Sequence, residues 1–218
     1  MALWMHWLNV LDSFLAFLSS QVGLGEGLAI VALTFLVRTA LLPISWPNAY
    51  RGCIRQKTLA RLQPELRRLK EKFGEQPEIY AEQLMALYRK NGISMADGRA
   101  IVGALAQTPV LFGLYQTLRK GARGRFLWVK DLSRPDVGLA ILAGLTTMLL
   151  MSVNPDLPEQ MRLMLLIVPS ILAVVVALKV ASALSLYWTA SNCYSAVQTA
   201  VLHHTVAKRI RSGSLKND

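Results

Sequence analysis

One arginine lies where a charged side chain is energetically expensive. Arg38 interrupts the apolar run LAIVALTFLVRTALLPI, which begins at Leu28. At 1.5 Å per helical residue, Arg38 would lie roughly 15 Å below Leu28, about halfway through the hydrocarbon layer of a bilayer. A charge at that depth costs about 2.5–3.5 kcal/mol on insertion scales, so such residues mark functional sites. Its natural chemistry is the attraction of anionic groups.

A buried ion pair is not available to this arginine. No Asp or Glu lies at matching depth in any predicted membrane span, and Glu26, on the same helix, is roughly 18 Å away. Water and polar side chains from neighbouring helices must therefore solvate Arg38.

Polar side chains at the same depth are predicted on two other helices. Gln107 would lie roughly 16 Å from Leu118, and Asn192 and Ser195 about 12 and 16 Å below Leu184. We therefore predict a wet, positively charged cavity that opens towards the cytoplasm. Its predicted lining residues are Arg38, Gln107, Trp188, Asn192, Ser195 and Gln198, and Thr199 lies on the same stripe as Trp188, Asn192 and Ser195.

Each of these residues also has a structural interpretation. Gln107 and Ser195 could be hydrogen-bonding groups that hold helices together. Trp188 could belong to an aromatic belt at the membrane surface. Arg38 could be purely structural, although that requires a partner which the sequence does not supply.

The composition requires a membrane around these helices. Of the 218 residues, 53% are hydrophobic and only 17% are charged, which is unsuitable for a soluble domain. We predict an all-α membrane protein with five transmembrane helices. The first spans residues 23–45, and four more lie within residues 99–204. The segment 163–202 holds two of them, with the turn near Lys179 and Ser182.

Two amphipathic segments complete the predicted architecture. Residues 1–22 carry Trp4, Trp7, Leu8, Leu11, Leu15 and Leu18 at helical spacing, which predicts an interfacial helix. Residues 46–98 predict a cytoplasmic antiparallel helical hairpin with leucine-rich seams, in which Pro64 marks a bend or restart. The hairpin could be just a solvated helical pair, but we expect it to contact substrate through Leu66, Leu69, Leu84 and Tyr88.

The net charge of +11 lies mostly between the apolar runs, so it indicates orientation and contact with lipid headgroups. Lys and Arg counts place the hairpin and the basic tail 205–218 in the cytoplasm and the N-terminus outside. The six basic residues of segment 119–134 oppose this orientation. The lack of a transit peptide indicates the bacterial plasma (inner) membrane.

Several activities find no support in the residues. No nucleotide-binding motif or catalytic triad indicates an enzyme, and no cofactor is predicted. Cys53, Cys193 and the three histidines lack the spacing of a metal site. No DNA-binding module is present, although ribosomal RNA at the membrane remains conceivable.

An ordered set of segments resembles the YidC/Oxa/Alb membrane protein insertase family from about residue 23 to 198. The segments are LTFLVRTALLPI, LQPELRRLKEKFG, LYRKNGI, AQTPVLFGLY, FLWVKDLS and LYWTASNCYSAVQ. The resemblance implies a core of five helices and identifies Arg38 and Gln107 as the groove arginine and glutamine, and Trp188 as the last-helix tryptophan. It implies insertion of nascent membrane proteins, alone or with the Sec translocon, near the ribosome.

The chain departs from the family pattern in three places. Ser94 and Met95 replace the usual Asn-Pro pair, VASALSLYW replaces a Pro-Gly turn, and the basic tail is short. A large extracytoplasmic domain is not expected. Two other functions stay open, namely a small anion transporter or channel with Arg38 as its anion site, and a membrane scaffold that inserts nothing.

Overall fold

The computed structural model describes residues 2–93, 112–113, 115–117, 124–153 and 159–211. Its described regular structure is helical, apart from one isolated bridge between Phe126 and Val129. The prediction of an all-α protein is therefore confirmed for the described residues. The predicted second span, at about residues 100–118, lies almost entirely outside them.

A sharp break separates the helix that carries Arg38 from the next one. α2 (Gly25–Ala40) and α3 (Leu42–Phe73) are bent by 70° at Leu41. Pro43 is tolerated in the first turn of α3, where its missing N–H has no helical acceptor. Within the described residues, only this bent pair, taken together, is both long and apolar enough to cross a membrane. α6 (Val137–Ser152) and the 162–177 part of α7 are apolar but shorter.

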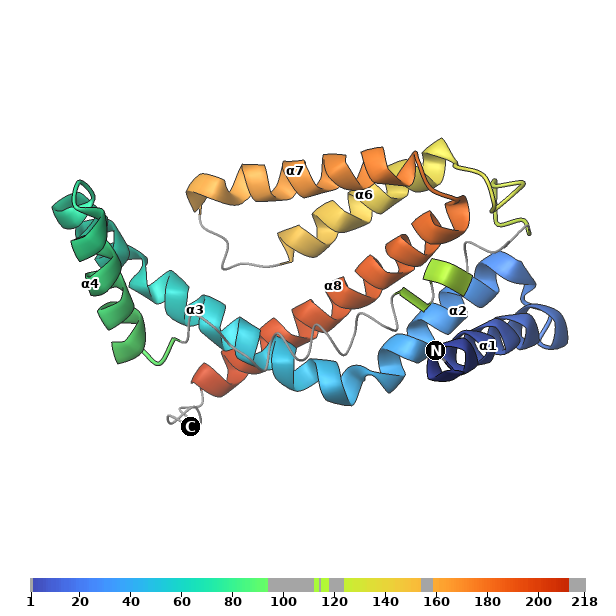
Figure 1. The fold of residues 1–218 in the computed structure, drawn as a ribbon, viewed down its shortest axis with the longest axis horizontal. Helices are drawn as coiled ribbons and strands as arrows, with labels where there is room; N and C mark the ends of the chain where they lie inside the picture. Colours follow the sequence, from blue (N-terminus) through green and yellow to red (C-terminus); the bar gives the residue numbers. More distant parts are fainter. Residues whose placement is uncertain (1, 94–111, 114, 118–123, 154–158, 212–218) are drawn as a thin grey trace.

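The hairpin consists of α3 and α4 (Pro77–Lys90), and α4 folds back beside the end of α3 (Figure 1). Of the expected bend or restart at Pro64, the restart is wrong, because α3 continues through this residue to Phe73. Pro64 is exposed, so solvent can hydrogen-bond the carbonyl that the proline leaves without a helical donor.

α8 (Ser182–Arg211) is the central helix, with α6 and α2 packed on it (Figure 1). α7 (Glu159–Ala177) packs mainly on α6. That contact is close, because a Cβ added at Gly144 would lie 2.4 Å from Cγ2 of Val174. The turn between α7 and α8 falls at residues 178–181, where the sequence predicted it.

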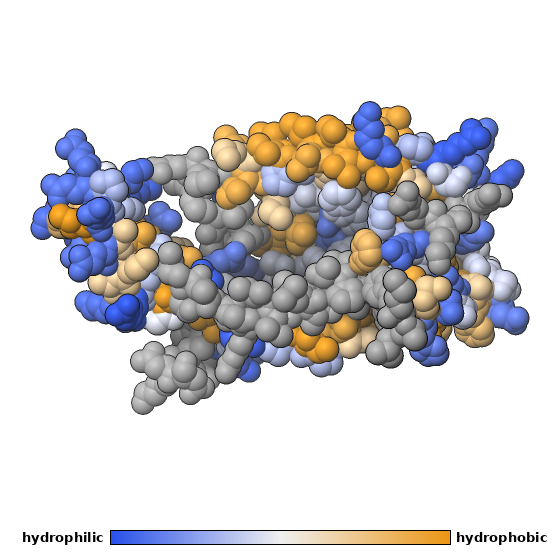
Figure 2. Space-filling view, in the orientation of Figure 1, coloured by the Kyte–Doolittle hydropathy of each residue, from blue (hydrophilic) through white to orange (hydrophobic). Residues whose placement is uncertain are grey.

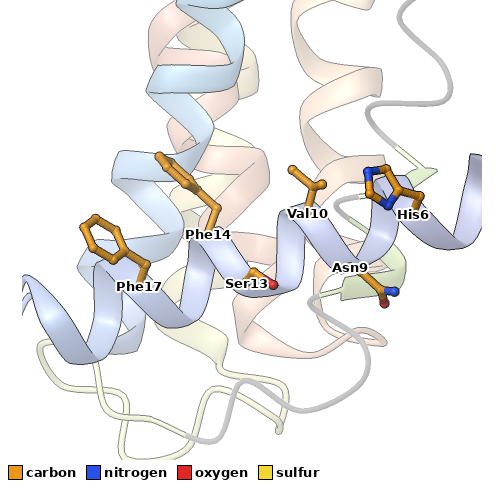
Figure 3. Close-up of a pocket in the computed structure, with 6 residues that line it drawn as sticks. All are labelled: His6, Asn9, Val10, Ser13, Phe14 and Phe17. Atoms are coloured by element: carbon orange, nitrogen blue, oxygen red, sulfur yellow. The ribbon is translucent and has the colours of Figure 1, made fainter.

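α1 (Ala2–Ala16) and the short π-helix η1 (Phe17–Gln21) form the predicted N-terminal helix. Leu8, Leu11 and Leu18 are buried, and Leu11 and Leu18 pack against Ala29 and Leu33 of α2. The leucine stripe is therefore covered by protein rather than open to lipid. The opposite face stays exposed and forms a shallow pocket (Figure 3), lined by His6, Asn9, Val10, Ser13, Phe14 and Phe17.

The C-terminal part of α8 packs against α3. The Sγ atom of Cys53 lies 3.4 Å from Nδ1 of His203, in a cluster with buried Leu202 and Val206. Residues 205–211 of the predicted tail continue α8.

Candidate functional site between α2 and α8

Arg38 reaches from the end of α2 to the neighbouring helix. Its Nη1 donates a hydrogen bond to Oγ of Ser195 at 3.1 Å, and its Nη2 donates to Oγ of Ser191. Both hydroxyls come from α8, and the arginine is only partly buried. Among the described residues, no carboxylate lies within ion-pair distance of the guanidinium. Neutral hydroxyls therefore solvate the charge without neutralising it, as the sequence required.

The acidic residue on the same helix as Arg38 lies far from the guanidinium. Glu26, at the start of α2, accepts a hydrogen bond of 2.7 Å from the backbone N–H of Gly124. It lies about three helical turns from Arg38, so the two charges occupy opposite ends of the same helix. The negative charge also suits the helix N-terminus, where the backbone amides create a positive potential.

Ser191 is a member of the site that the sequence did not indicate. It lies four residues before Ser195, so the two hydroxyls share one face of α8 and can both reach one guanidinium. That spacing was the available signal. On the next residue of α2, Oγ1 of Thr39 lies 3.4 Å from the hydroxyl of Tyr194, which adds a second polar link between the helices.

Asn192 was expected in the cavity with Arg38, but its side chain points elsewhere. Its Nδ2 donates a hydrogen bond of 2.8 Å to Oγ1 of Thr147 on α6, and Asn192 is only 8% exposed. The Thr147 hydroxyl in turn donates to the carbonyl of Ala143. Asn192 thus connects α6 and α8 in a buried contact.

The comparisons with known proteins indicate one family over most of the chain. The family model described as 60Kd inner membrane protein matches residues 17–209. The chain belongs to the YidC/Oxa1 insertase family. The resemblance found in the motifs is confirmed, and the family is one of inner membrane insertases, which are not enzymes.

Relatives of very different length share this region. The membrane protein insertase MisCA of Bacillus subtilis (strain 168) is 31% identical over 205 residues, which cover 88% of this chain and 76% of the relative. The membrane protein insertase YidC of Fusobacterium nucleatum is 32% identical, with 87% and 93% covered. The YidC of Cellvibrio japonicus is 29% identical and covers 94% of this chain, but the chain spans only 37% of that relative's length.

The other predicted lining residues of the cavity form no hydrogen bond with Arg38 in the described part of this YidC/Oxa1 family member. Trp188 and Gln198 are half-buried on α8, whereas Gln107 lies outside the described residues. Figure 2 shows the molecule hollowed in front of α8, below the apolar surface over α7, with hydrophilic and hydrophobic residues in its visible lining. A groove that holds Arg38 remains a prediction.

The hairpin residues predicted to contact substrate are only partly accessible to solvent. Leu66, Leu69, Leu84 and Tyr88 are all half-buried. The more exposed apolar side chains of α4 are Ile79 and Met85, at 41% and 53%. Within the described part of the chain, no three His, Cys, Asp or Glu side chains cluster closely enough to hold a metal ion.

Proposed function

We propose that this chain is a membrane protein insertase that uses Arg38 to attract hydrophilic, acidic segments of nascent membrane proteins into an intramembrane groove. The observation that carries the proposal is a guanidinium bonded by two serine hydroxyls, with no carboxylate beside it among the described residues. A charge that is solvated but not neutralised can still attract an anion, and the attraction is stronger where the local dielectric constant is low.

The free energy for insertion comes from the substrate's own apolar segment as it reaches lipid. The barrier is desolvation of the polar tail that must cross, and a wet groove shortens the apolar distance to be crossed. The membrane potential adds about 2.3 kcal/mol per charge per 100 mV. This mechanism requires no nucleotide and no covalent step.

The remaining features of the proposal concern topology and partners. We propose five spans in the bacterial inner membrane, with the N-terminus outside and the hairpin and the tail in the cytoplasm. The hairpin contacts the nascent chain through the seam of Leu66, Leu69, Leu84 and Tyr88, beside exposed Ile79 and Met85. Ribosomes and the Sec translocon are the proposed sources of substrate.

Reconstituted insertion tests the proposal directly. The purified full chain in liposomes is given a single-span substrate, made once with an acidic translocated tail and once with a neutral tail of equal length. We expect Arg38→Ala to slow insertion of the acidic substrate about tenfold. The reason is the loss of a charge-assisted hydrogen bond between the guanidinium and the acidic tail, worth about 1.4 kcal/mol. The neutral substrate should be affected much less.

Lys179→Ala is the matched control, since Lys179 is an exposed base in the α7–α8 turn, far along α8 from Arg38. It should insert both substrates normally. Equal insertion of both substrates by wild type and Arg38→Ala would remove the charge role. No insertion by the wild-type protein, combined with anion flux through the same liposomes, would favour a channel instead.

A further inference from the structure

We propose that Leu127 and Trp128 form a rigid tip that anchors one end of the helix bundle in the headgroup region of anionic phospholipid. They lie in the middle of the 124–136 loop, which joins the bundle at the start of α6. The inference rests on the proposed function only in placing the chain in a membrane.

The backbone of this tip favours glycine, yet the residue is leucine. Phe126 and Val129 exchange two backbone hydrogen bonds, of 2.9 and 2.8 Å, which close a two-residue turn. Leu127 is the first central residue and has φ of +51°, a conformation that glycine adopts without strain and leucine does not. Its side chain is 76% exposed, so packing within the protein does not explain its presence.

Trp128 is fixed in place beside this leucine. Its Nε1 donates a hydrogen bond of 3.1 Å to Oδ1 of Asp136, the same oxygen that caps α6 by accepting from the N–H of Leu139. The indole is therefore tied at its polar edge to a helix terminus, while the residue stays 54% exposed. Two large apolar side chains thus project outward from a loop that backbone and side-chain hydrogen bonds hold in place.

The base of the loop is anchored to three helices. Leu132 is fully buried, and its carbonyl accepts from the N–H of Ala183, at the start of α8. Gly124 donates to Glu26 of α2, and Asp136 caps α6. The tip therefore sits at the end of the bundle where these helices begin (Figure 1).

The residues around the tip indicate that it binds lipid. Val137 and Ile141, which are 63% and 50% exposed, continue an apolar stripe along α6 directly from the Trp128–Asp136 contact. Arg125 and Lys130 are exposed on either side of the tip. Tryptophan with flanking Lys and Arg is the composition of membrane–water interfaces, and the positive charges complement anionic headgroups. A rigid tip also loses little conformational entropy on insertion.

The test places a fluorescent nitrobenzoxadiazole label at the tip of the full-length protein. Leu127→Cys and, as a matched control, Ser133→Cys on the same loop are made in a Cys53→Ala, Cys193→Ser background and reconstituted in vesicles. Lipids brominated near the headgroup should quench the 127 label roughly threefold more than the 133 label, and more strongly with phosphatidylglycerol than with phosphatidylcholine alone. Aqueous iodide should quench mainly the 133 label.

Equal exposure of both labels to iodide in vesicles would overturn the proposal. So would a 127 label that is protected only in native membranes, because that result would indicate a protein partner.

Leu127→Asn gives a second measurement without labels, since asparagine tolerates positive φ. It should unfold in detergent at or above the wild-type temperature, yet lose part of the added stability that anionic vesicles give. Since no insertion substrate is involved, these outcomes are independent of the Arg38 experiment.

Discussion

Ser191 and Asn192 are neighbours in the chain, yet α8 turns them towards different helices. Ser191 accepts from Arg38 on α2, in a partly buried contact that leaves the positive charge unneutralised. Asn192 donates to Thr147 on α6, in a buried contact between neutral groups. Successive helical residues are about 100° apart, so one polar segment can supply both sides of the central helix.

The difference separates two uses of polar side chains in an apolar protein. On the α6 side, a buried hydrogen bond joins two neutral side chains, so the contact holds helices together. On the α2 side, the hydroxyls stabilise a charge that keeps its capacity to attract an anion. Variants on the first side should change stability, and variants on the second should change the response to substrate charge.

The largest effect is expected from reversing the charge. Arg38→Glu should lower insertion of an acidic-tailed substrate by more than about tenfold, or roughly 1.4 kcal/mol, because attraction becomes repulsion. A substrate with a lysine-containing tail should recover part of the loss. The measurement is insertion into liposomes at low and high salt. The charge role fails if both tails are affected equally.

The α6 side should respond in stability alone. Asn192→Ala, Thr147→Val and the double variant form a double-mutant cycle. Hydrogen bonds between helices in membranes have coupling energies averaging about 0.6 and reaching roughly 1.7 kcal/mol, and we expect a value in that range. Denaturant unfolding in mixed micelles measures it. Altered selectivity for acidic tails in Asn192→Ala, at unchanged stability, would return this residue to the groove.

The serines should have a smaller effect on insertion. The double variant Ser191→Ala, Ser195→Ala should slow insertion of acidic tails about threefold, roughly 0.6 kcal/mol, because Arg38 loses its fixed position but keeps its charge. Each single variant should do less, since the remaining hydroxyl still accepts from the guanidinium. Insertion of the neutral-tailed substrate is the control, and a drop equal to that of the acidic substrate would mean general destabilisation.

The smallest effect is expected at Tyr194. Its hydroxyl lies 3.4 Å from Oγ1 of Thr39, a long contact between exposed groups, so Tyr194→Phe should change stability by less than about 0.5 kcal/mol. The ring should stay in place, because its edge-to-face contact with Phe35 has a centroid separation of 5.5 Å. Thermal unfolding checks this, and a large loss would show that the contact is shorter in the membrane.

Much of the fold followed from residue patterns. The apolar helices, the turn near Ser182 and the helical hairpin were all predicted, because they depend on hydrophobic length and on leucine spacing. The isolated Arg38 also followed, since the sequence supplies no acid at its depth. The continuous helix through Pro64 did not follow from the residue pattern, because a proline alone does not show whether a solvent-exposed helix ends or continues. The angle of the 70° break at Leu41 depends on local backbone geometry, which residue spacing does not give.

The sequence by itself determined that this is a helical protein of the YidC/Oxa1 family, with an arginine inside an apolar helix and no acidic residue predicted at the same depth. Only the tertiary structure decided that Ser191 accepts a hydrogen bond from Arg38, that Asn192 faces α6, and that the α1 leucines pack on α2. Periodicity identifies which residues share a face of a helix. It does not identify the neighbour on that face, because long-range packing among several helices chooses it.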